Sequence, residues 1–306
     1  MSITNYPNGV SSFGMPLIGM TTGNVWFVHS SGSNGNSGTD ADNPFADIDY
    51  AIGRCTADKG DIIFVMPGHT ETLTAAGAID CDVAGISIIG LGTNRSRPTI
   101  SVSTTAGVDI DIDAENIVID NLVFDLTGVD AVAAFFDVNQ SDFTLQNCEV
   151  IMADTGGQAV HAVEGGAARA HILNNQFLAP VTAGAENAIE FVNACDDWRV
   201  IGNVIDGNFS EGCIFTSDTP LRLLIKDNQL TNISAGDAAI VLGATSVGVT
   251  GMICNNMISV ADSTGITAQR VTQLGQATWF ENYIANSTAA FAKEAAVLAP
   301  LATYGS

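Results

Sequence analysis

Short apolar strands interrupted by asparagine recur along most of the chain. Seven segments align on one position: VIDNLVF, LQNCEV, ILNNQF, VIGNVI, IKDNQL, ICNNMI and WFENYI. An apolar residue lies three places before and two places after that position in every segment, as Val118 and Val123 do in the first. Successive spacings are 27, 27, 28, 25, 28 and 26 residues. A period of this length, without helical patterns between the strands, indicates a solenoid.

A second set of apolar strands runs in step with the first. They begin around Phe135, Val160, Ile189, Ile214, Ile240 and Ile266, and from the third to the sixth the preceding residue is small. The leucine-rich repeat has a similar length, but its consensus is absent. The sequence therefore predicts an all-β fold, a parallel β-helix of about 25–28 residues per coil.

The repeated asparagines have a structural explanation. Coils of a β-helix stack about 4.8 Å apart, so equivalent residues form rows, and an asparagine at a bend can hydrogen-bond the ones above and below it. Asparagine also accepts the left-handed conformation that a bend needs. We predict a structural ladder, not a catalytic site, made of Asn121, Asn175, Asn203, Asn228, Asn256 and Asn282.

Helical patterns are confined to the two ends of the predicted solenoid. Apolar residues at helical spacing predict a short cap helix at about 44–57: Phe45, Ile48, Ala51, Ile52 and Cys55. NSTAAFAKEAAVLAP predicts a C-terminal helix with Ser287 or Thr288 as its N-cap. The expected organisation is an arm with a first strand and loop (1–42), a β-helix with its cap (43–286), and a C-terminal helix and tail (287–306).

Charge and hydropathy narrow the classes of partner. The chain has 33 acidic and 10 basic residues, a formal net charge of -23. It should repel nucleic acid and anionic membranes, so we expect neither as a partner. No apolar run approaches the roughly 20 residues of a membrane helix, and the N-terminus has no signal-peptide pattern. Six widely spaced cysteines, without metal-ligand spacing, are expected to be reduced and buried.

Three constellations carry potential chemistry, each with a simpler interpretation. The first is a basic cluster on successive coils, which could be a lyase site or a salt-bridged surface. It consists of Arg199, Arg222 and Lys226, with Asp196, Asp197, Asp218 and Asp227 nearby. The second is His161 and Glu190, which occupy comparable positions on successive coils. They could form an acid/base pair or a cross-coil hydrogen bond. The third is one strand face with Asp109, Asp111 and Asp113. These residues could bind Ca²⁺, or they could form the solvent-exposed side of a half-buried strand. We favour the simpler interpretation each time and predict no catalytic, cofactor-binding or metal-binding residues.

The N-terminal region carries a family resemblance. Residues 23–72, GNVWFVHSSGSNGNSGTDADNPFADIDYAIGRCTADKGDIIFVMPGHTET, resemble the opening of pectin-lyase-like β-helices. Together with NYPNGVSSFG before them, they look most like β-helical virion proteins of tailed bacteriophages. The resemblance implies a right-handed parallel β-helix that serves as a trimeric capsid decoration (cement) protein or as a tailspike.

Residues 1–25 contain apolar anchors without periodicity, among them Tyr6, Phe13, Met15, Leu17 and Ile18. We predict an extended arm that docks onto another protein or a neighbouring subunit, although the same segment could pack on its own β-helix. The leading hypothesis is a non-enzymatic phage structural protein. It would be a homotrimer that decorates the capsid, made in the host cytoplasm and bound to the major capsid protein or another virion protein. The alternatives are a tailspike that binds or depolymerises host glycans, and a free-standing polysaccharide-active enzyme.

Overall fold

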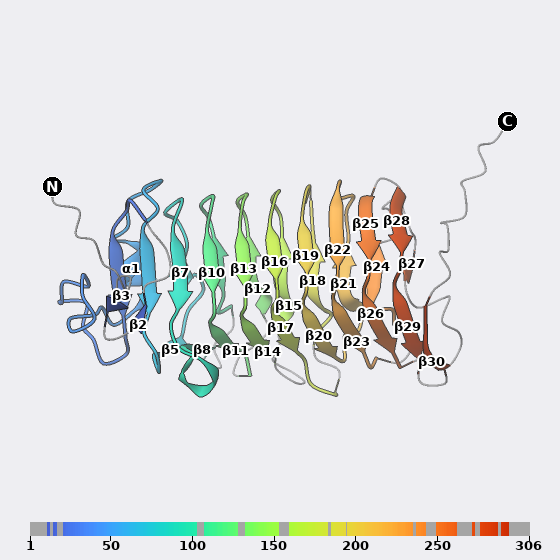
Figure 1. Ribbon diagram of the computed structural model, residues 1–306, viewed down its shortest axis with the longest axis horizontal. Helices are drawn as coiled ribbons and strands as arrows, with labels where there is room; N and C mark the ends of the chain where they lie inside the picture. Colours follow the sequence, from blue (N-terminus) through green and yellow to red (C-terminus); the bar gives the residue numbers. More distant parts are fainter. Residues whose placement is uncertain are drawn as a thin grey trace.

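The computed structural model is a parallel β-solenoid, elongated along one axis, with about 26 residues per turn (Figure 1). The predicted fold class is therefore confirmed. The structure describes residues 11–12, 15–16, 21–102, 107–127, 132–152, 159–182, 185–193, 195–234, 237–242, 249–261, 271–272, 276–286 and 289–293. Among these, no helix is long and apolar enough to cross a membrane.

Each complete coil contributes one strand to each of three sheets. Sheet 1 contains β3 (Val25–Val28), β4 (Ile62–Val65), β7 (Ser87–Gly90), β10 (Val118–Asp120), β13 (Thr144–Gln146), β16 (His171–Leu173), β19 (Arg199–Ile201), β22 (Leu223–Lys226), β25 (Thr250–Cys254) and β28 (Gln276–Phe280). Sheet 2 contains β5 (Thr70–Leu73), β8 (Thr99–Val102), β11 (Val123–Asp125), β14 (Glu149–Ile151), β17 (Gln176–Leu178), β20 (Val204–Gly207), β23 (Gln229–Asn232), β26 (Met257–Val260), β29 (Tyr283–Asn286) and β30 (Ala289–Lys293). Sheet 3 contains β6 (Ile79–Asp80), β9 (Ile110–Ile112), β12 (Val132–Val138), β15 (Ala159–Gly165), β18 (Asn187–Phe191), β21 (Gly212–Thr216), β24 (Ile240–Leu242) and β27 (Val271–Thr272).

The core consists of apolar columns that run along the solenoid. Strand side chains alternate between the two faces of a sheet, and the parallel register places the same inward position of each coil over the next. In sheet 1 this column includes Leu145, Ile172, Val200, Ile225 and Ile253, all buried. Each such side chain contributes about 1.5–3 kcal/mol when fully buried. The columns hold the coils in one register, because a one-residue slip would turn every apolar side chain outward.

The second repeat needs a small correction of register. Strand pairing aligns Phe136 and Val163 with Ile189, rather than the predicted Phe135 and Val160. Phe135 is nevertheless buried and packs edge-to-face on Phe136, with ring centroids 4.9 Å apart. Two consecutive buried residues in this strand obscure the alternation from which the register was predicted. At the other end Val271 pairs with Ile240, and Ile266 lies outside the described residues.

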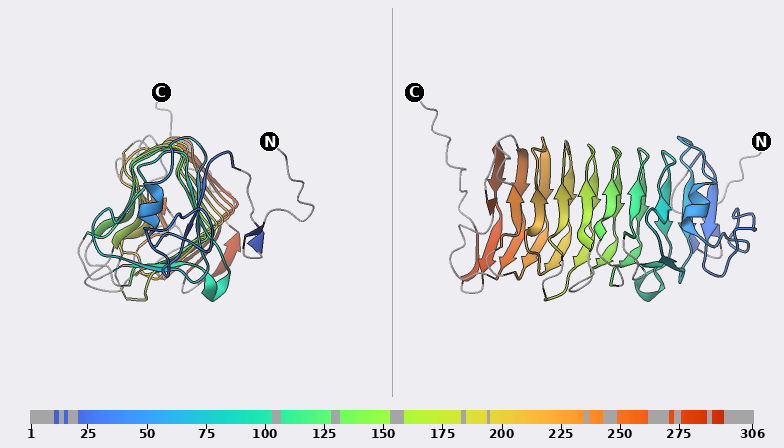
Figure 2. Two further views of the ribbon diagram at one scale, coloured as in Figure 1. Left: turned by 90° about the vertical axis from the view of Figure 1, so that its left-hand side faces the viewer. Right: turned by 180° about the vertical axis from the view of Figure 1, so that it is seen from behind.

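The cap helix is present but shorter than predicted. α1 spans Ile48–Ile52, and in a view along the solenoid it lies across the opening of the first coil (Figure 2, left). Its own residues Ile48, Ala51 and Ile52 are buried against the first coil. Phe45 is buried as well, but its backbone is bridged to Val28 and stays extended, so the helix cannot begin at residue 44. The helix contacts β3, β4 and β6, whose apolar ends would otherwise face water.

The C-terminal segment was predicted as a helix, and this is wrong where the structure describes it. Residues 289–293 form β30, which pairs antiparallel with β29. The last coil presents the unpaired edge of sheet 2, and an added strand satisfies its backbone hydrogen bonds where a helix could not. Residues 294–306 lie outside the described part of the chain.

Five asparagines form an uninterrupted ladder at the corner between sheets 1 and 2. The amide Nδ2 of each of the first four donates to Oδ1 of the next asparagine, over 3.2 Å from Asn175 to Asn203 and 3.1 Å from Asn203 to Asn228. The distance is 2.9 Å from Asn228 to Asn256 and again from Asn256 to Asn282. Each Nδ2 also donates to a backbone carbonyl, and all five residues are buried. The ladder thus satisfies backbone groups that neither sheet can pair at this corner.

Asn121 does not belong to this ladder, contrary to our prediction. Strand pairing places Leu122, not Asn121, in line with Cys148 and Asn175. Asn121 falls one place earlier, in a column of residues with positive φ: Asn121, Asn147, Asn174, Gly202, Asp227, Asn255 and Glu281. The left-handed conformation and the ladder therefore belong to two adjacent positions, which explains the paired asparagines of NNQF and NNMI.

Candidate functional site

A row of carboxylates runs along the outer face of sheet 3. Strand pairing places Asp80, Asp111, Asp137, Glu164 and Glu190 opposite one another on five successive strands. We call these five residues the acidic row. Adjacent strands lie about 4.8 Å apart, so each carboxylate has like-charged neighbours on the coils beside it. Ile110 and Ile112, which flank Asp111, point into the core, as expected for a half-buried strand.

The acidic row was not predicted, although the sequence contains a signal for it. An acid directly after an apolar strand residue recurs at positions 80, 111, 137, 164 and 190, although other acids such as Asp109 and Asp113 share this local pattern. The varying loops before each acid hide this spacing until the ladder asparagines fix the length of each coil. Of the three aspartates singled out on this strand, only Asp111 belongs to the row. Asp109 accepts a hydrogen bond from the backbone N–H of Gly77 (2.6 Å), and Asp113 accepts one from the side-chain amide of Asn139 (3.1 Å).

The electrostatics of the row disfavour full ionisation. Burial, together with the charges of Asp109, Asp113, Asp137 and Asp80, raises the pKa of Asp111 to about 6. Burial is also the main reason that the pKa values of Asp80, Asp137 and Glu164 lie above their ordinary range. A protonated carboxyl in the row relieves repulsion between its neighbours, so the solenoid should be more stable in mild acid.

Asp111→Asn is expected to raise the melting temperature at about pH 8 by about 1–4 °C and to leave it unchanged near pH 4. A carboxyl whose folded pKa is raised contributes most to stability below its unfolded pKa, about 3.9, and this contribution is lost as the pH rises through about 6. Thermal denaturation in EDTA across this range measures the effect. Asp206→Asn, at an exposed position of sheet 2, is the control. A wild-type to variant difference that does not vary with pH would contradict this account.

His161 lies at one end of the acidic row and joins two of its members. Its Nε2 is 2.7 Å from Oε2 of Glu190 and 3.9 Å from Oε2 of Glu164, and its Nδ1 is 2.5 Å from Oδ1 of Asn187. His161 and Glu190 are buried. Burial lowers the pKa of His161, but the hydrogen bond and charge of Glu190 raise it above its ordinary value. Burial likewise raises the pKa of Glu190, and the hydrogen bond and charge of His161 lower it more. The predicted cross-coil contact is present.

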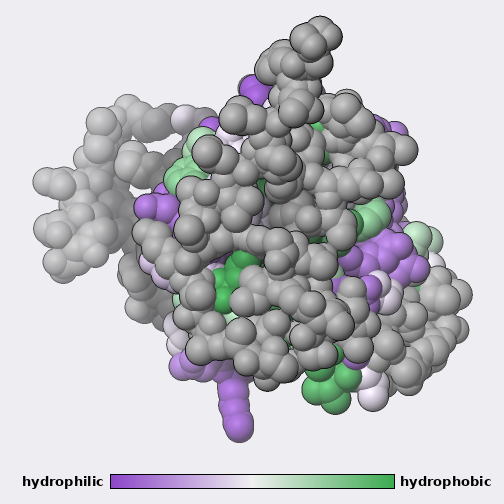
Figure 3. Space-filling model, turned by 90° about the vertical axis from the view of Figure 1, so that its right-hand side faces the viewer, coloured by the Kyte–Doolittle hydropathy of each residue, from purple (hydrophilic) through white to green (hydrophobic). Residues whose placement is uncertain are grey.

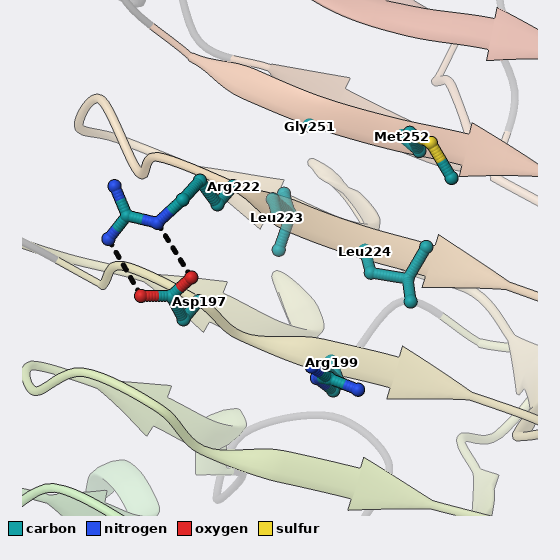
Figure 4. A pocket seen from close by; sticks show the side chains of 7 residues that line it. All are labelled: Asp197, Arg199, Arg222, Leu223, Leu224, Gly251 and Met252. Atoms are coloured by element: carbon teal, nitrogen blue, oxygen red, sulfur yellow. Dashed lines mark hydrogen bonds and ion pairs between the residues drawn. The ribbon is translucent and has the colours of Figure 1, made fainter.

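The salt-bridged surface favoured from the sequence is present for Arg222 and Lys226 on sheet 1. Arg222 makes a bidentate pair with Asp197, both contacts 2.7 Å, and Lys226 Nζ is 3.3 Å from Asp227. Asp218 accepts from the backbone of Thr219 instead. Arg222 and Asp197 line one end of an open groove of about 420 Å³, and the side chains of Arg199, Leu224 and Met252 follow on three adjacent strands (Figure 4).

The outer face of sheet 1 has more apolar than polar side chains, with charged residues among them. One outward column contains Val118, Leu224 and Met252 together with His171 and Arg199, and the other contains Leu173, Ile201, Cys254 and Phe280 together with Lys226. We call the part formed by Leu173, Ile201, Leu224 and Met252 the apolar face; Met252 is 45% exposed and the other three are half-buried. Nearer the N-terminus, Phe27 and Phe64 of the same sheet are already covered, with Ala41 packed among them. Around the C-terminal end, both hydrophobic and hydrophilic side chains reach the surface (Figure 3).

The predicted attachment residues lie mostly outside the described part of the chain. This applies to Tyr6, Phe13, Leu17 and Ile18. Met15 belongs to β2 (Met15–Pro16), which pairs antiparallel with β1 (Ser11–Ser12). Their attachment role stays a prediction.

Comparison with known proteins supports the fold. No protein-family model matches the chain, and no curated protein matches it in sequence. Among solved structures, a rhamnogalacturonan lyase superposes with a TM-score of 0.56 at 13% identity, covering 86% of this chain and 74% of the lyase. This chain is thus a parallel β-solenoid similar in architecture to that lyase.

Proposed function

We propose that this protein is a non-enzymatic structural component of a bacteriophage particle, a homotrimer that decorates the capsid. The apolar face of sheet 1 is the observation that supports self-association most strongly. Burial of apolar surface stabilises association by roughly 25 cal/mol per Å², so contact with a second copy would be favourable at this face. The resemblance of residues 5–72 to phage virion proteins supports the assignment to a particle.

The three sheets differ in their suitability as a subunit interface. On sheet 3 the acidic row would bring carboxylates of two copies together at a cost in free energy. The outward positions of sheet 2 include the polar Thr99, Gln176 and Asp206, and at its C-terminal end the exposed Met257 and Tyr283. Only on sheet 1 do apolar residues predominate among the described outward positions. We therefore assign the apolar face to contact with a second copy of this chain.

Removal of residues 1–20 is expected to abolish binding to the particle without dissociating the trimer. The truncation stops before Thr21 and Asn24, because the Thr21 hydroxyl donates to the Gly60 carbonyl and the Asn24 backbone N–H donates to buried Asp61. Co-sedimentation of the truncated and full-length proteins with particles that lack this protein measures attachment. Full binding by the truncated trimer would remove the arm from the account.

A polysaccharide-active tailspike is the second candidate, and the acidic row is the observation that favours it. Two carboxyls separated by roughly 5–9.5 Å are the requirement of glycoside hydrolysis, and neighbours or next neighbours in the row meet it. The pKa of Asp111, raised to about 6, suits a general acid. Depolymerisation of a bacterial surface polysaccharide that is lost in Asp111→Asn would replace the non-enzymatic proposal with this one.

A further inference from the structure

We propose that His161, Glu164 and Glu190 form a binding site for a transition-metal ion of the Zn²⁺ class. The three ligand atoms, Nε2 of the histidine and one carboxylate oxygen from each glutamate, all lie within 4.8 Å of one another. A metal held by bonds of about 2.1 Å requires ligand separations of about 3–3.4 Å, so small side-chain rotations would complete the site. The site is independent of the proposed role in a particle.

The backbone presets this geometry. β15 and β18 are adjacent parallel strands, and their register pairs Glu164 with Glu190 and His161 with Asn187. His161 and Glu190 are 7% and 8% exposed, so little rotamer freedom remains to be lost on binding. Glu164 is more accessible, with 28% of its side chain exposed, and provides the path to solvent.

Asn187 gives the histidine the orientation that a metal ligand needs. With Nδ1–H donating to Oδ1 of Asn187 over 2.5 Å, the free position on the ring is Nε2, which faces both carboxylates. Metal-binding histidines are usually held in this way, by a carbonyl or carboxylate on the other ring nitrogen. In the metal-free protein, a proton on Nε2 takes the place of the ion.

The buried amide of Asn187 has one hydrogen-bond donor without a partner. Asn187 is completely buried, yet its amide Nδ2 has no hydrogen-bond partner. Buried donors are nearly always paired, because an unpaired one costs about 1–3 kcal/mol. This donor belongs to the residue that holds Nδ1 of His161, so the amide beside the cluster is incompletely satisfied in the metal-free protein.

The choice of metal follows from the ligands. Imidazole with two carboxylates suits Zn²⁺, Mn²⁺, Co²⁺ or Ni²⁺, whereas Ca²⁺ prefers a shell made of oxygen atoms. Asp137, next to Glu164 in the acidic row, adds negative charge and favours any divalent cation. The nitrogen ligand therefore provides the selectivity.

Calorimetric titration of the full-length, tag-free and EDTA-stripped protein with Zn²⁺ tests the proposal. We expect one ion per chain and release of a proton from Nε2, seen as an enthalpy that depends on the buffer. His161→Gln should weaken binding by more than about 100-fold, and Asn187→Ala by about 10–100-fold. Visible absorption of the Co²⁺ form should vanish in the same variants.

Glu164→Gln keeps the test decisive if the buried variants fold poorly, because this accessible side chain can change without disturbing the core. It should weaken Zn²⁺ binding by at least about tenfold without lowering the melting temperature in EDTA. His171→Gln, on sheet 1 and outside the triad, should bind Zn²⁺ like the wild type. Absence of binding, binding insensitive to both His161→Gln and Glu164→Gln, or displacement of Zn²⁺ by Ca²⁺ would each overturn the proposal.

Discussion

Replacement of Asn228 by alanine is expected to lower the free energy of unfolding by about 3–5 kcal/mol. Asn228 Oδ1 accepts from the backbone N–H of Asn203 (2.9 Å), and its Nδ2 donates to the carbonyl of Val200 (2.9 Å). Alanine leaves the buried N–H of Asn203 without an acceptor, at about 1–3 kcal/mol, removes the second hydrogen bond to the Val200 carbonyl and the side-chain links of the ladder, and adds a small cavity. Urea denaturation followed by circular dichroism measures the loss.

Asn255→Gly is the matched control, because Asn255 precedes a ladder residue but has a different role. It is exposed, and its φ of 58° lies in the left-handed region that glycine adopts without strain. We expect a change within about 0.5 kcal/mol. Equal losses in Asn228→Ala and Asn255→Gly would show that the ladder has no special energetic role.

The asparagine pattern shows how far sequence reasoning reaches. The period and the buried columns follow from the sequence, because hydrophobic burial and hydrogen bonding repeat with every coil. The register of a strand within its coil can be predicted from the sequence only where one of two adjacent positions is polar, because the apolar one must then face the core. In the first segment Val118 and Ile119 are both apolar, as are Val123 and Phe124, so a shift of one residue fits equally well. The structure settles it by burying Ile119 and Phe124, which moves Asn121 out of the ladder.

Features that depend on neighbouring coils were harder to predict. The acidic row arises because five loops of different length bring their acids to the same outward position. The strand β30 forms because the last coil has a free edge, while the local sequence AAFAKEAA favours a helix. By contrast, the pairing of His161 with Glu190 was predicted from coil spacing alone, since both residues lie close to well-aligned strand positions.

Ile201→Asp is expected to convert the trimer to a monomer while the solenoid stays folded. Ile201 points outward from β19 in the middle of the apolar face and is half-buried in a single copy. A carboxylate there remains solvated in the monomer but would be buried without a partner at a subunit contact, which costs several kcal/mol. Sedimentation velocity measures the oligomeric state, and circular dichroism reports the fold.

Ile151→Asp provides the matched control for the interface. Ile151 is also half-buried and points outward, but from sheet 2. It should leave the oligomer intact. Dissociation by Ile151→Asp but not by Ile201→Asp would move the interface from sheet 1 to sheet 2.

The mass of the full-length protein in solution, by light scattering after gel filtration, tests the central claim most directly. Three copies of 31.7 kDa give about 95 kDa, a closed symmetric assembly built on the apolar face. A mass near 95 kDa is the predicted result. A single species at 31.7 kDa across the accessible concentration range would contradict the trimer and, with it, the proposed role as a decoration protein.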